Sequence, residues 1–356
     1  MYSVHTIQQL LLAARYAGSD VTLTQGGGGN VSVKSSDGKI MFIKASGYTL
    51  NEVSPEGGFV ETDRYAAVSA LRDLDRSDKS RSAIQDEFST LLGKAAITDQ
   101  LRPSIEAGFH AILPGVVIHT HPVYINAFLC MKDGVNLLKT ICDCNHPVVD
   151  YYPPGYELAL MVDKEYGKLN TKSGGIYLLN HGFVSWAETA EDAARLMDNV
   201  ETSAKIYLGE LKPKGHEPSI KTDEITSMIR NTGFTGSLHV SSEGFVTEAA
   251  FDNDLAAAVL NPLVPDDAVY NYGRIFTTDG KTLPDLPEKF ILIVKNQGII
   301  IGAPTGRTIK NMEETLTAHI MVRRLINGRG VPVELPQEEI DFITGMESEK
   351  FRSALK

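Results

Sequence analysis

Residues 115–123 read GVVIHTHPV, an apolar run that ends in two histidines. Such a run predicts a short β-strand, on which side chains two residues apart point to the same face. His119 and His121 can therefore reach one ion. A third histidine, His181, follows another apolar run in YLLNHGFV, residues 177–184. Three imidazoles leave one position open on a tetrahedral ion, as in catalytic zinc sites, whereas an isolated HxH pair is more often structural.

Composition limits the classes of function that the chain can serve. Its 356 residues are 42% hydrophobic, which is enough for two cores or one large core. The net charge of −11 argues against a nucleic-acid partner. No stretch approaches the roughly 20 apolar residues of a membrane span, and the N-terminus favours an amphipathic helix over a signal peptide. We therefore expect a cytoplasmic protein without a membrane partner.

The chain has three cysteines, Cys130, Cys142 and Cys144. Three thiols cannot form a disulfide framework, and the close pair of Cys142 and Cys144 closes no useful loop. We expect all three to be reduced, with metal binding by the close pair as the alternative.

Strand and helix patterns alternate along the chain, which predicts the α/β class. Residues 23–47 predict a glycine loop, a strand, a turn and a returning strand, and two more strands are expected at 176–179 and 183–186. Helices are expected at about 64–74, 81–95, 122–131, 156–162 and 189–211. The polar segment KPKGHEP, residues 212–218, is the candidate boundary between a first unit of residues 1–213 and a smaller second unit of residues 219–356.

Part of the first unit recurs in the second. Residues 176–200 align without gaps on residues 292–316. Each copy predicts a strand, a tight Asn-x-Gly turn, a strand, a threonine cap and a helix. The identical residues lie 116 positions apart and are Asn180 and Asn296, Gly182 and Gly298, Ala187 and Ala303, and Thr189 and Thr305. The alternative is that two strand–helix units resemble each other by chance.

The second copy does not keep the metal-binding histidines. Gln297 stands where the first copy has His181. A weaker echo of residues 113–122 in residues 264–273 would place Tyr270 and Tyr272 at the positions of the other two histidines. The second unit is therefore expected to be a degenerate copy that keeps the scaffold and loses the metal.

Two loops in the first unit could bind an anion. Residues 26–30, GGGGN, precede a strand, and successive N–H groups in such a loop can form an anion nest. The loop lacks the GxGxxG pattern of dinucleotide folds, and plain flexibility is the alternative. The turn at residues 44–47, KASG, could bring a hydroxyl, an N–H group and a cation to the same anion.

Glu106 lies thirteen residues before His119, at the start of an expected helix. A carboxylate beside a divalent cation can act as a ligand or as an acid/base. The alternative is an ordinary acidic residue in the first turn of a helix, where the helix dipole favours it. Ser104 could be the N-cap of this helix or a phosphate contact.

Six motifs occur in the order found in the class II aldolase/adducin-head family, and residues 5–210 resemble that family. The motifs are GGGGNVSVK, IKASG, RPSIEAGFH, HTHP, YYPPGYELA and LLNHGFVSWAETAEDA. The family includes fuculose- and rhamnulose-phosphate aldolases, ribulose-phosphate 4-epimerase and related dehydratases. RPSIE, KASG and HTHP look closest to the aldolase portion of bifunctional rhamnulose-phosphate aldolase/dehydrogenase proteins. The resemblance implies a three-layer αβα fold with a mostly antiparallel central sheet, followed here by the smaller degenerate half.

The resemblance also implies roles for individual residues. His119, His121 and His181 would bind one Zn²⁺ per chain, and Glu106 matches the family's carboxylate acid/base. The phosphate-binding positions of the family match Asn30, Ser46, Gly47 and Ser104, with Gly29 contributing its backbone. Two departures weaken the match: Ile105 stands where simpler fuculose-type aldolases have a second phosphate-binding serine, and the tyrosine that acts as their second acid has no secure counterpart.

The leading functional hypothesis is a Zn²⁺-dependent lyase that cleaves a ketose 1-phosphate into dihydroxyacetone phosphate and an aldehyde. The ion would polarise the carbonyl and stabilise the enediolate, while Glu106 moves the proton at carbon. A 4-epimerase, a dehydratase or a decarboxylase could use the same groups. Adducin-type heads offer a different class, a non-catalytic interaction module. The resemblance implies homo-oligomers with a sugar phosphate as the small-molecule partner.

Overall fold

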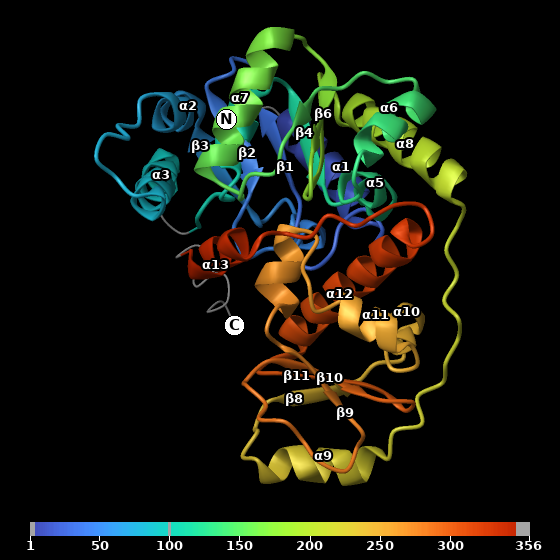
Figure 1. Ribbon diagram of the computed structural model, residues 1–356. Helices are drawn as coiled ribbons and strands as arrows, with labels where there is room; N and C mark the ends of the chain where they lie inside the picture. Colours follow the sequence, from blue (N-terminus) through green and yellow to red (C-terminus); the bar gives the residue numbers. More distant parts are fainter. Residues whose placement is uncertain (1–3, 99–100, 347–356) are drawn as a thin grey trace.

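Seven strands form the central sheet of the first unit, in the order β3-β2-β1-β4-β7-β6-β5 (Figure 1). The computed structural model describes residues 4–98 and 101–346. Within them, each neighbouring pair in this sheet is antiparallel except β5 with β6, so the expected mostly antiparallel sheet is confirmed. The strands are β1 (Asn30–Lys34), β2 (Ile40–Lys44), β3 (Phe59–Asp63), β4 (Val116–Thr120), β5 (Val148–Val149), β6 (Gly174–Leu178) and β7 (Gly182–Ala187).

Helices cover both faces of this sheet, because its strands are apolar on both sides. On β4, Val116 and Ile118 enter one core while Val117 enters the other. The first core takes α1 (Val4–Gly18), α5 (Val123–Leu129), α6 (Gly134–Cys142) and α8 (Ala190–Leu208). The second core takes α2 (Arg64–Arg72), α3 (Arg81–Ala95), α4 (Ala107–Ile112) and α7 (Tyr156–Leu169). The expected αβα layers are confirmed.

The second unit forms a four-stranded sheet in the order β8-β11-β10-β9. One face packs on α9 and the other on α12, which lies between the two sheets (Figure 1). The strands are β8 (Ser237–Val240), β9 (Ile275–Thr278), β10 (Phe290–Val294) and β11 (Gly298–Ala303). The helices are α9 (Thr222–Asn231), α10 (Gly244–Glu248), α11 (Asn253–Ala258), α12 (Gly306–Ile326) and α13 (Gln337–Gly345), with a single π-helical turn, η2, at Asp267–Asn271.

The internal repeat is a structural repeat. Asn180 and Asn296 occupy the same left-handed conformation, with φ of 51° and 57°. Thr189 and Thr305 both cap the following helix, because each side chain accepts a hydrogen bond from the backbone N–H three residues later. The predicted strand, turn, strand, cap and helix are therefore confirmed in both copies.

The repeat extends over four strands. These strands show that residues 113–122 do not correspond to residues 264–273, contrary to what the sequence had suggested. β8-β11-β10-β9 has the same order and directions as β4-β7-β6-β5, including one parallel pair at the end. His119 pairs with Val184, and the corresponding Ile300 pairs with Val240. The structural counterparts of His119 and His121 are thus Val240 and Ser242. The proposed match of Tyr270 and Tyr272 is wrong, because residues 264–273 contain the helical turn η2 instead of a strand.

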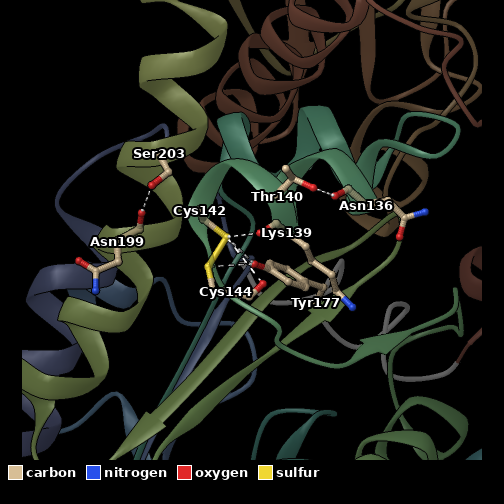
Figure 2. Close-up of a disulfide and its surroundings, with 8 residues drawn as sticks. All are labelled: Asn136, Lys139, Thr140, Cys142, Cys144, Tyr177, Asn199 and Ser203. Carbon is tan, nitrogen blue, oxygen red and sulfur yellow. Dashed lines mark hydrogen bonds between the residues drawn. A yellow bond between two sulfur atoms is a disulfide. The ribbon is translucent and has the colours of Figure 1, made fainter.

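A disulfide joins Cys142 and Cys144 at the end of α6, beside Tyr177 (Figure 2). The expectation of reduced thiols is wrong for this pair. Asp143 between them has a left-handed φ of 48°, which turns the chain back and brings the two Cα atoms to 5.3 Å. That separation suits a disulfide. Cys130 is free and buried, as expected.

The segment at residues 212–218 has no helix or strand and runs along the outside of the molecule between the two sheets (Figure 1). The chain later returns to the first unit, where Pro332 bridges to Met131 and Glu339 pairs with Arg81. The unit boundaries stay a prediction, and their outer ends lie outside the described residues. Within the described part of the chain, no helix has the length and apolar character needed to cross a membrane.

Candidate active site

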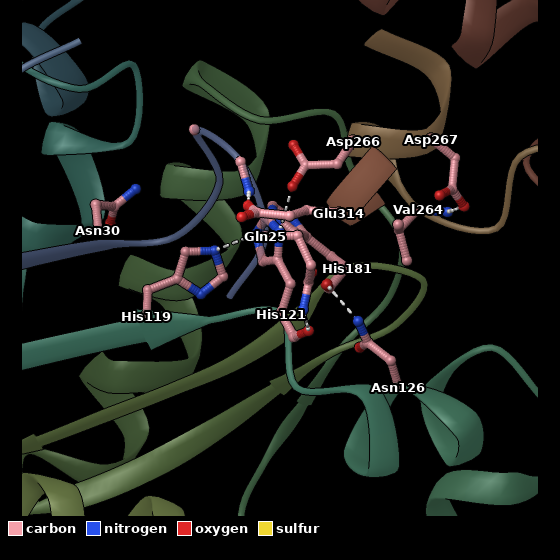
Figure 3. A network of polar contacts seen from close by, with 12 residues as sticks. Gln25, Asn30, His119, His121, Asn126, His181, Val264, Asp266, Asp267 and Glu314 are labelled. Atoms are coloured by element: carbon pink, nitrogen blue, oxygen red, sulfur yellow. Dashed lines mark hydrogen bonds and ion pairs between the residues drawn. The ribbon is translucent and has the colours of Figure 1, made fainter. Parts of the chain in front are cut away.

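The three histidines predicted to bind metal meet at one end of the central sheet. β4 and β7 are antiparallel, so the end of β4 lies beside the start of β7 and the turn that holds His181. The ring centroids are 4.9–5.0 Å apart, and one nitrogen from each ring lies within 4.8 Å of the others. Figure 3 shows the imidazoles directed toward one another. All three residues are buried.

Hydrogen bonds fix which nitrogen of two rings faces the centre. Nδ1 of His119 donates to the carbonyl of Phe183 at 3.1 Å, and Nδ1 of His121 donates to the Asp266 carboxylate at 2.7 Å. Burial lowers the pKa of His119 to about 4, so its Nε2 keeps a lone pair. The two Nε2 atoms face each other at 3.2 Å. Two nitrogens bound to a tetrahedral zinc ion are about 3.3 Å apart, so the arrangement fits such an ion.

His181 completes the set from the turn between β6 and β7. Asn126 donates to the His181 carbonyl at 3.1 Å and holds this turn against α5. The His181 ring is buried, and its Nδ1 has no hydrogen-bond partner within the described residues. Burial lowers the pKa of this imidazole well below its usual value. A neutral imidazole keeps a lone pair on one of its ring nitrogens, so this ring is available to a metal ion.

Glu106 lies at the same point, brought there by the start of α4. Its Oε1 is 3.4 Å from Nε2 of His181, and its Oε2 is 3.6 Å from Nε2 of His119. The side chain is 5% exposed and accepts a hydrogen bond from Nδ2 of Asn30 at 2.6 Å. Oε1 has no hydrogen-bond partner in the described part of the chain. Glu106 is therefore close enough to the three histidines to act as a further ligand or as an acid/base, and its role stays a prediction.

A buried polar chain behind Glu106 was not predicted. Asn30, Ser32 and Lys34 lie on one face of β1, because they alternate along the strand. Oδ1 of Asn30 contacts Nε2 of His110, Nδ1 of His110 contacts Ser32 at 2.8 Å, and Ser32 accepts from Lys34 at 3.1 Å. The alternation of polar residues in NVSVK is the only signal in the sequence, and it equally suits a strand with one face in water.

The residues predicted to bind phosphate lie in two adjoining cavities. Gly29, Asn30, Ser46 and Ser104 line a cavity of about 30 Å³ together with Glu106, His121 and His181. Gly47 lines the neighbouring cavity instead. The backbone at Gly29 has φ of 58°, and a Cβ atom there would lie 2.9 Å from the carbonyl oxygen of His119. Only glycine lets the loop approach the metal-binding strand this closely.

The second unit holds three parts of this site, which the sequence did not indicate. Asp266 binds His121, as described above. On α12, Glu314 accepts from the N–H of Gly26 at 2.8 Å, and Arg307 donates to the carbonyl of Gly47 at 2.6 Å. Both loops that were predicted to bind an anion are therefore held by one helix of the second unit. These contacts join residues more than 140 positions apart, and no local pattern reveals such pairs.

Comparisons with known proteins identify the family of the chain. A model of the family described as Class II Aldolase and Adducin N-terminal domain matches residues 8–208. The curated protein "Uncharacterized oxidoreductase YuxG" of Bacillus subtilis is 27% identical over 214 residues, which are 57% of this chain and 30% of that protein. The "3-oxo-tetronate 4-phosphate decarboxylase" of Escherichia coli is 26% identical over 179 residues, which are 46% of this chain and 77% of that protein.

One solved structure that is similar to this chain is the N-terminal class II aldolase domain of a conserved protein from Thermoplasma acidophilum. It is 26% identical and covers 59% of this chain and 96% of that one, with a TM-score of 0.48. The chain spans less than a third of the Bacillus subtilis relative, but the family match includes every predicted metal-binding and phosphate-binding residue. The chain belongs to the class II aldolase and adducin N-terminal domain family.

Proposed function

We propose that this protein is a Zn²⁺-dependent lyase that cleaves a ketose 1-phosphate to dihydroxyacetone phosphate and an aldehyde. The observation that carries the proposal is the meeting of three buried imidazoles with one carboxylate, Glu106, which lies 3.4 Å from His181 and 3.6 Å from His119. A non-catalytic interaction module does not need three buried imidazoles and a buried carboxylate at one point. Membership of a family described by class II aldolases supports the reaction class.

The residues divide the chemistry between them. His119, His121 and His181 would hold a divalent cation, which would polarise the substrate carbonyl as a Lewis acid. As the carbon–carbon bond breaks, the hydroxyl on the departing carbon gives up its proton to water and becomes the aldehyde carbonyl. The electron pair of the bond stays with the dihydroxyacetone phosphate fragment, and Glu106 delivers a proton to that carbon, so no net proton is consumed. Asn30 holds Oε2 of Glu106, which leaves Oε1 for proton transfer. We propose that Gly29, Asn30, Ser46, Gly47 and Ser104 hold the phosphate and keep the reacting atoms aligned.

A second candidate reaction is decarboxylation of a phosphorylated 3-oxo sugar acid. The Escherichia coli relative carries that activity in its name, and the match covers 77% of its length. The same residues would serve, because loss of carbon dioxide also leaves an electron pair on a carbon next to a carbonyl, where Glu106 can place a proton.

A panel of ketose 1-phosphates distinguishes these reactions. The zinc-loaded protein is expected to release dihydroxyacetone phosphate, measured with a coupled reductase, and to lose this activity on chelation. Glu106→Gln should keep its zinc but turn over about 10²- to 10⁴-fold more slowly, whereas His119→Ala should lose the metal. Release of carbon dioxide from 3-oxo sugar acid phosphates would show a decarboxylase instead. Interconversion of pentulose phosphates without release of dihydroxyacetone phosphate would show an epimerase.

We also propose that residues 1–213 form the catalytic unit, that residues 219–356 form the accessory unit, and that the chain assembles as a cytoplasmic homo-oligomer. The accessory role rests on Asp266, Glu314 and Arg307, which contact the first unit at the site. Light scattering of the purified protein tests the assembly, and a monomeric mass would contradict it.

A further inference from the structure

A cavity of about 60 Å³ adjoins the one that holds Glu106 and the histidines. Both cavities are lined by Gly27 of the glycine loop and by Val269 of the second unit, so they meet at that point. The adjoining cavity is walled on one side by the two anion-binding loops and on the other by η2, α12 and the residues before β10. Three of its lining residues are cationic, namely Arg274, Lys289 and Arg307.

Two of these three cations have no salt-bridge partner among the described residues. Arg307 pairs with Glu52 at 2.7 Å. Neither Arg274 nor Lys289 has an acidic group within 4 Å in the described ranges 4–98 and 101–346. Nη1 of Arg274 donates to the carbonyls of Val269 and Tyr270, and its other two nitrogens have no hydrogen-bond partner among those residues. The structure likewise gives the Lys289 ammonium no polar partner there.

The charged forms of Arg274 and Lys289 are disfavoured by partial burial and by their mutual repulsion. Both are partly buried, and burial lowers the pKa of each. Arg274 also lowers the pKa of Lys289 because the two charges repel each other, and the neighbouring Glu288 offsets this repulsion only in part. Partly buried like charges are costly unless an anion compensates them. The chain as a whole carries a net charge of −11, so an anionic ligand needs such a local concentration of positive charge.

We propose that Arg274 and Lys289 bind a second anionic group of the substrate, so that the substrate is a sugar phosphate with a carboxylate or a second phosphate at its other end. The inference rests on the proposed function, because it names the substrate class of the same site. One anionic group would lie against Ser46 and Ser104, and the other would lie beyond Gly27, between the two units. Substrate selection would then belong to the second unit.

Titration with inorganic phosphate tests the site itself. The wild-type protein is expected to bind phosphate in two events by calorimetry. Lys289→Gln should weaken one of them about 10- to 100-fold and leave the other unchanged. Arg274→Gln should do the same, but Lys289 gives the cleaner variant because Arg274 also holds two carbonyls. Lys295→Gln, an exposed lysine on the same unit, is the matched control and should bind like the wild type.

Substrate comparison tests the assignment. The wild type should prefer ketose 1-phosphates with a terminal carboxylate or phosphate about 10-fold or more over those with a terminal hydroxyl. Lys289→Gln should remove this preference through KM, and the better of the two anionic series identifies the second group. Unchanged phosphate binding and unchanged preference in both variants would overturn the inference, even if dihydroxyacetone phosphate is still released. Conversely, two phosphate sites without any lyase activity would overturn the lyase alone.

Discussion

Residues 176–200 and 292–316 fold into the same strand, turn, strand and helix, yet only the first copy lies at the candidate metal site. Both turns need a residue in the left-handed conformation, and both have asparagine there. Both helices need an N-cap, and both have threonine. The position between asparagine and glycine differs, because it is a buried histidine in one copy and a partly exposed glutamine in the other.

The comparison separates what the fold requires from what the chemistry requires. Backbone needs are local, so a copy that loses its function still keeps Asn296 and Thr305. A metal site is not local, because His181 needs two more imidazoles from the neighbouring strand. In the second copy the corresponding positions are Val240, the last residue of β8, and Ser242, two residues later. Its turn is met by the end of the linker instead, where the N–H of Ser219 donates to the carbonyl of Gln297.

The largest expected effect comes from making the first turn resemble the second. His181→Gln should weaken zinc binding by at least about 100-fold, because it removes a direct ligand, whereas loss of an outer partner alone costs about 10- to 100-fold. The fold should remain, since the turn needs only Asn180 and Gly182. Zinc per chain after dialysis, with circular dichroism on the same sample, measures both.

The reverse change is the matched control. Gln297→His should bind no zinc in the second copy, because Val240 and Ser242 offer no imidazole beside it. Retention of one zinc by His181→Gln, or gain of a second zinc by Gln297→His, would show that the comparison does not identify the site.

The next effect tests whether the second unit supports the candidate metal site of the first. Asp266 accepts from Nδ1 of His121 at 2.7 Å. Asp266→Asn removes the negative charge that favours this tautomer, so zinc affinity should fall about 10-fold or more. The exposed Asp254→Asn on the same unit should change nothing. Competition with a chromogenic chelator gives the affinities, and an Asp266 variant with wild-type affinity would leave the second unit without a role at the metal.

The architecture of the first unit follows from local pattern. Helical periodicity placed α3 at residues 81–95, and apolar runs indicated both strands that flank the repeat turn. β3 and α6 were not predicted. The β3 segment, FVETD, is short and half polar, and α6 begins with a glycine that follows Asp133 in the left-handed conformation. The Cys142–Cys144 disulfide was not predicted either, because it depends on the left-handed backbone of Asp143.

The site was only half accessible to sequence reasoning. The histidines and Glu106 lie in segments whose spacing and motifs identify them. No motif identifies Asp266 or His110, because each contacts the site through residues that are distant in sequence. VPDDAVYNYG was compared with the wrong part of the first unit, since a helical turn and a strand can share a pattern of apolar residues when both are buried.

A smaller effect separates the two asparagines of the repeat turn. Nδ2 of Asn180 donates to the carbonyls of Leu263 and Val333, at 3.0 and 2.7 Å, whereas Asn296 is exposed. Glycine suits the left-handed backbone at both positions. Asn180→Gly should therefore lower the free energy of unfolding by about 2 kcal/mol, because the buried carbonyl of Leu263 and the partly buried bond to Val333 lose their donor. Asn296→Gly should lower it by about 0.5 kcal/mol or less. Urea unfolding measures both, and equal effects would show that Asn180 has only a backbone role.

The smallest effect concerns Glu201 on α8, whose counterpart on α12 is Thr317. Glu201 is buried and accepts from the N–H of Ile125 at 3.2 Å, near the start of the helix that follows His121. Burial raises its pKa from 4.5 to about 8. The folded state therefore binds more protons than the unfolded state between about pH 4.5 and 8, so this group's contribution to stability is complete below that window and is lost as pH rises through it.

From pH 6 to pH 7 the free energy of unfolding should fall by up to about 1.4 kcal/mol on account of Glu201. Glu201→Gln should remove this contribution while keeping an acceptor for Ile125, and Glu201→Thr would do so by adopting the residue of the second copy. Glu191→Gln on the exposed side of the same helix should keep it. Urea unfolding at the two pH values decides the matter, since an identical pH dependence in wild type and Glu201→Gln would place the titrating group elsewhere in the chain.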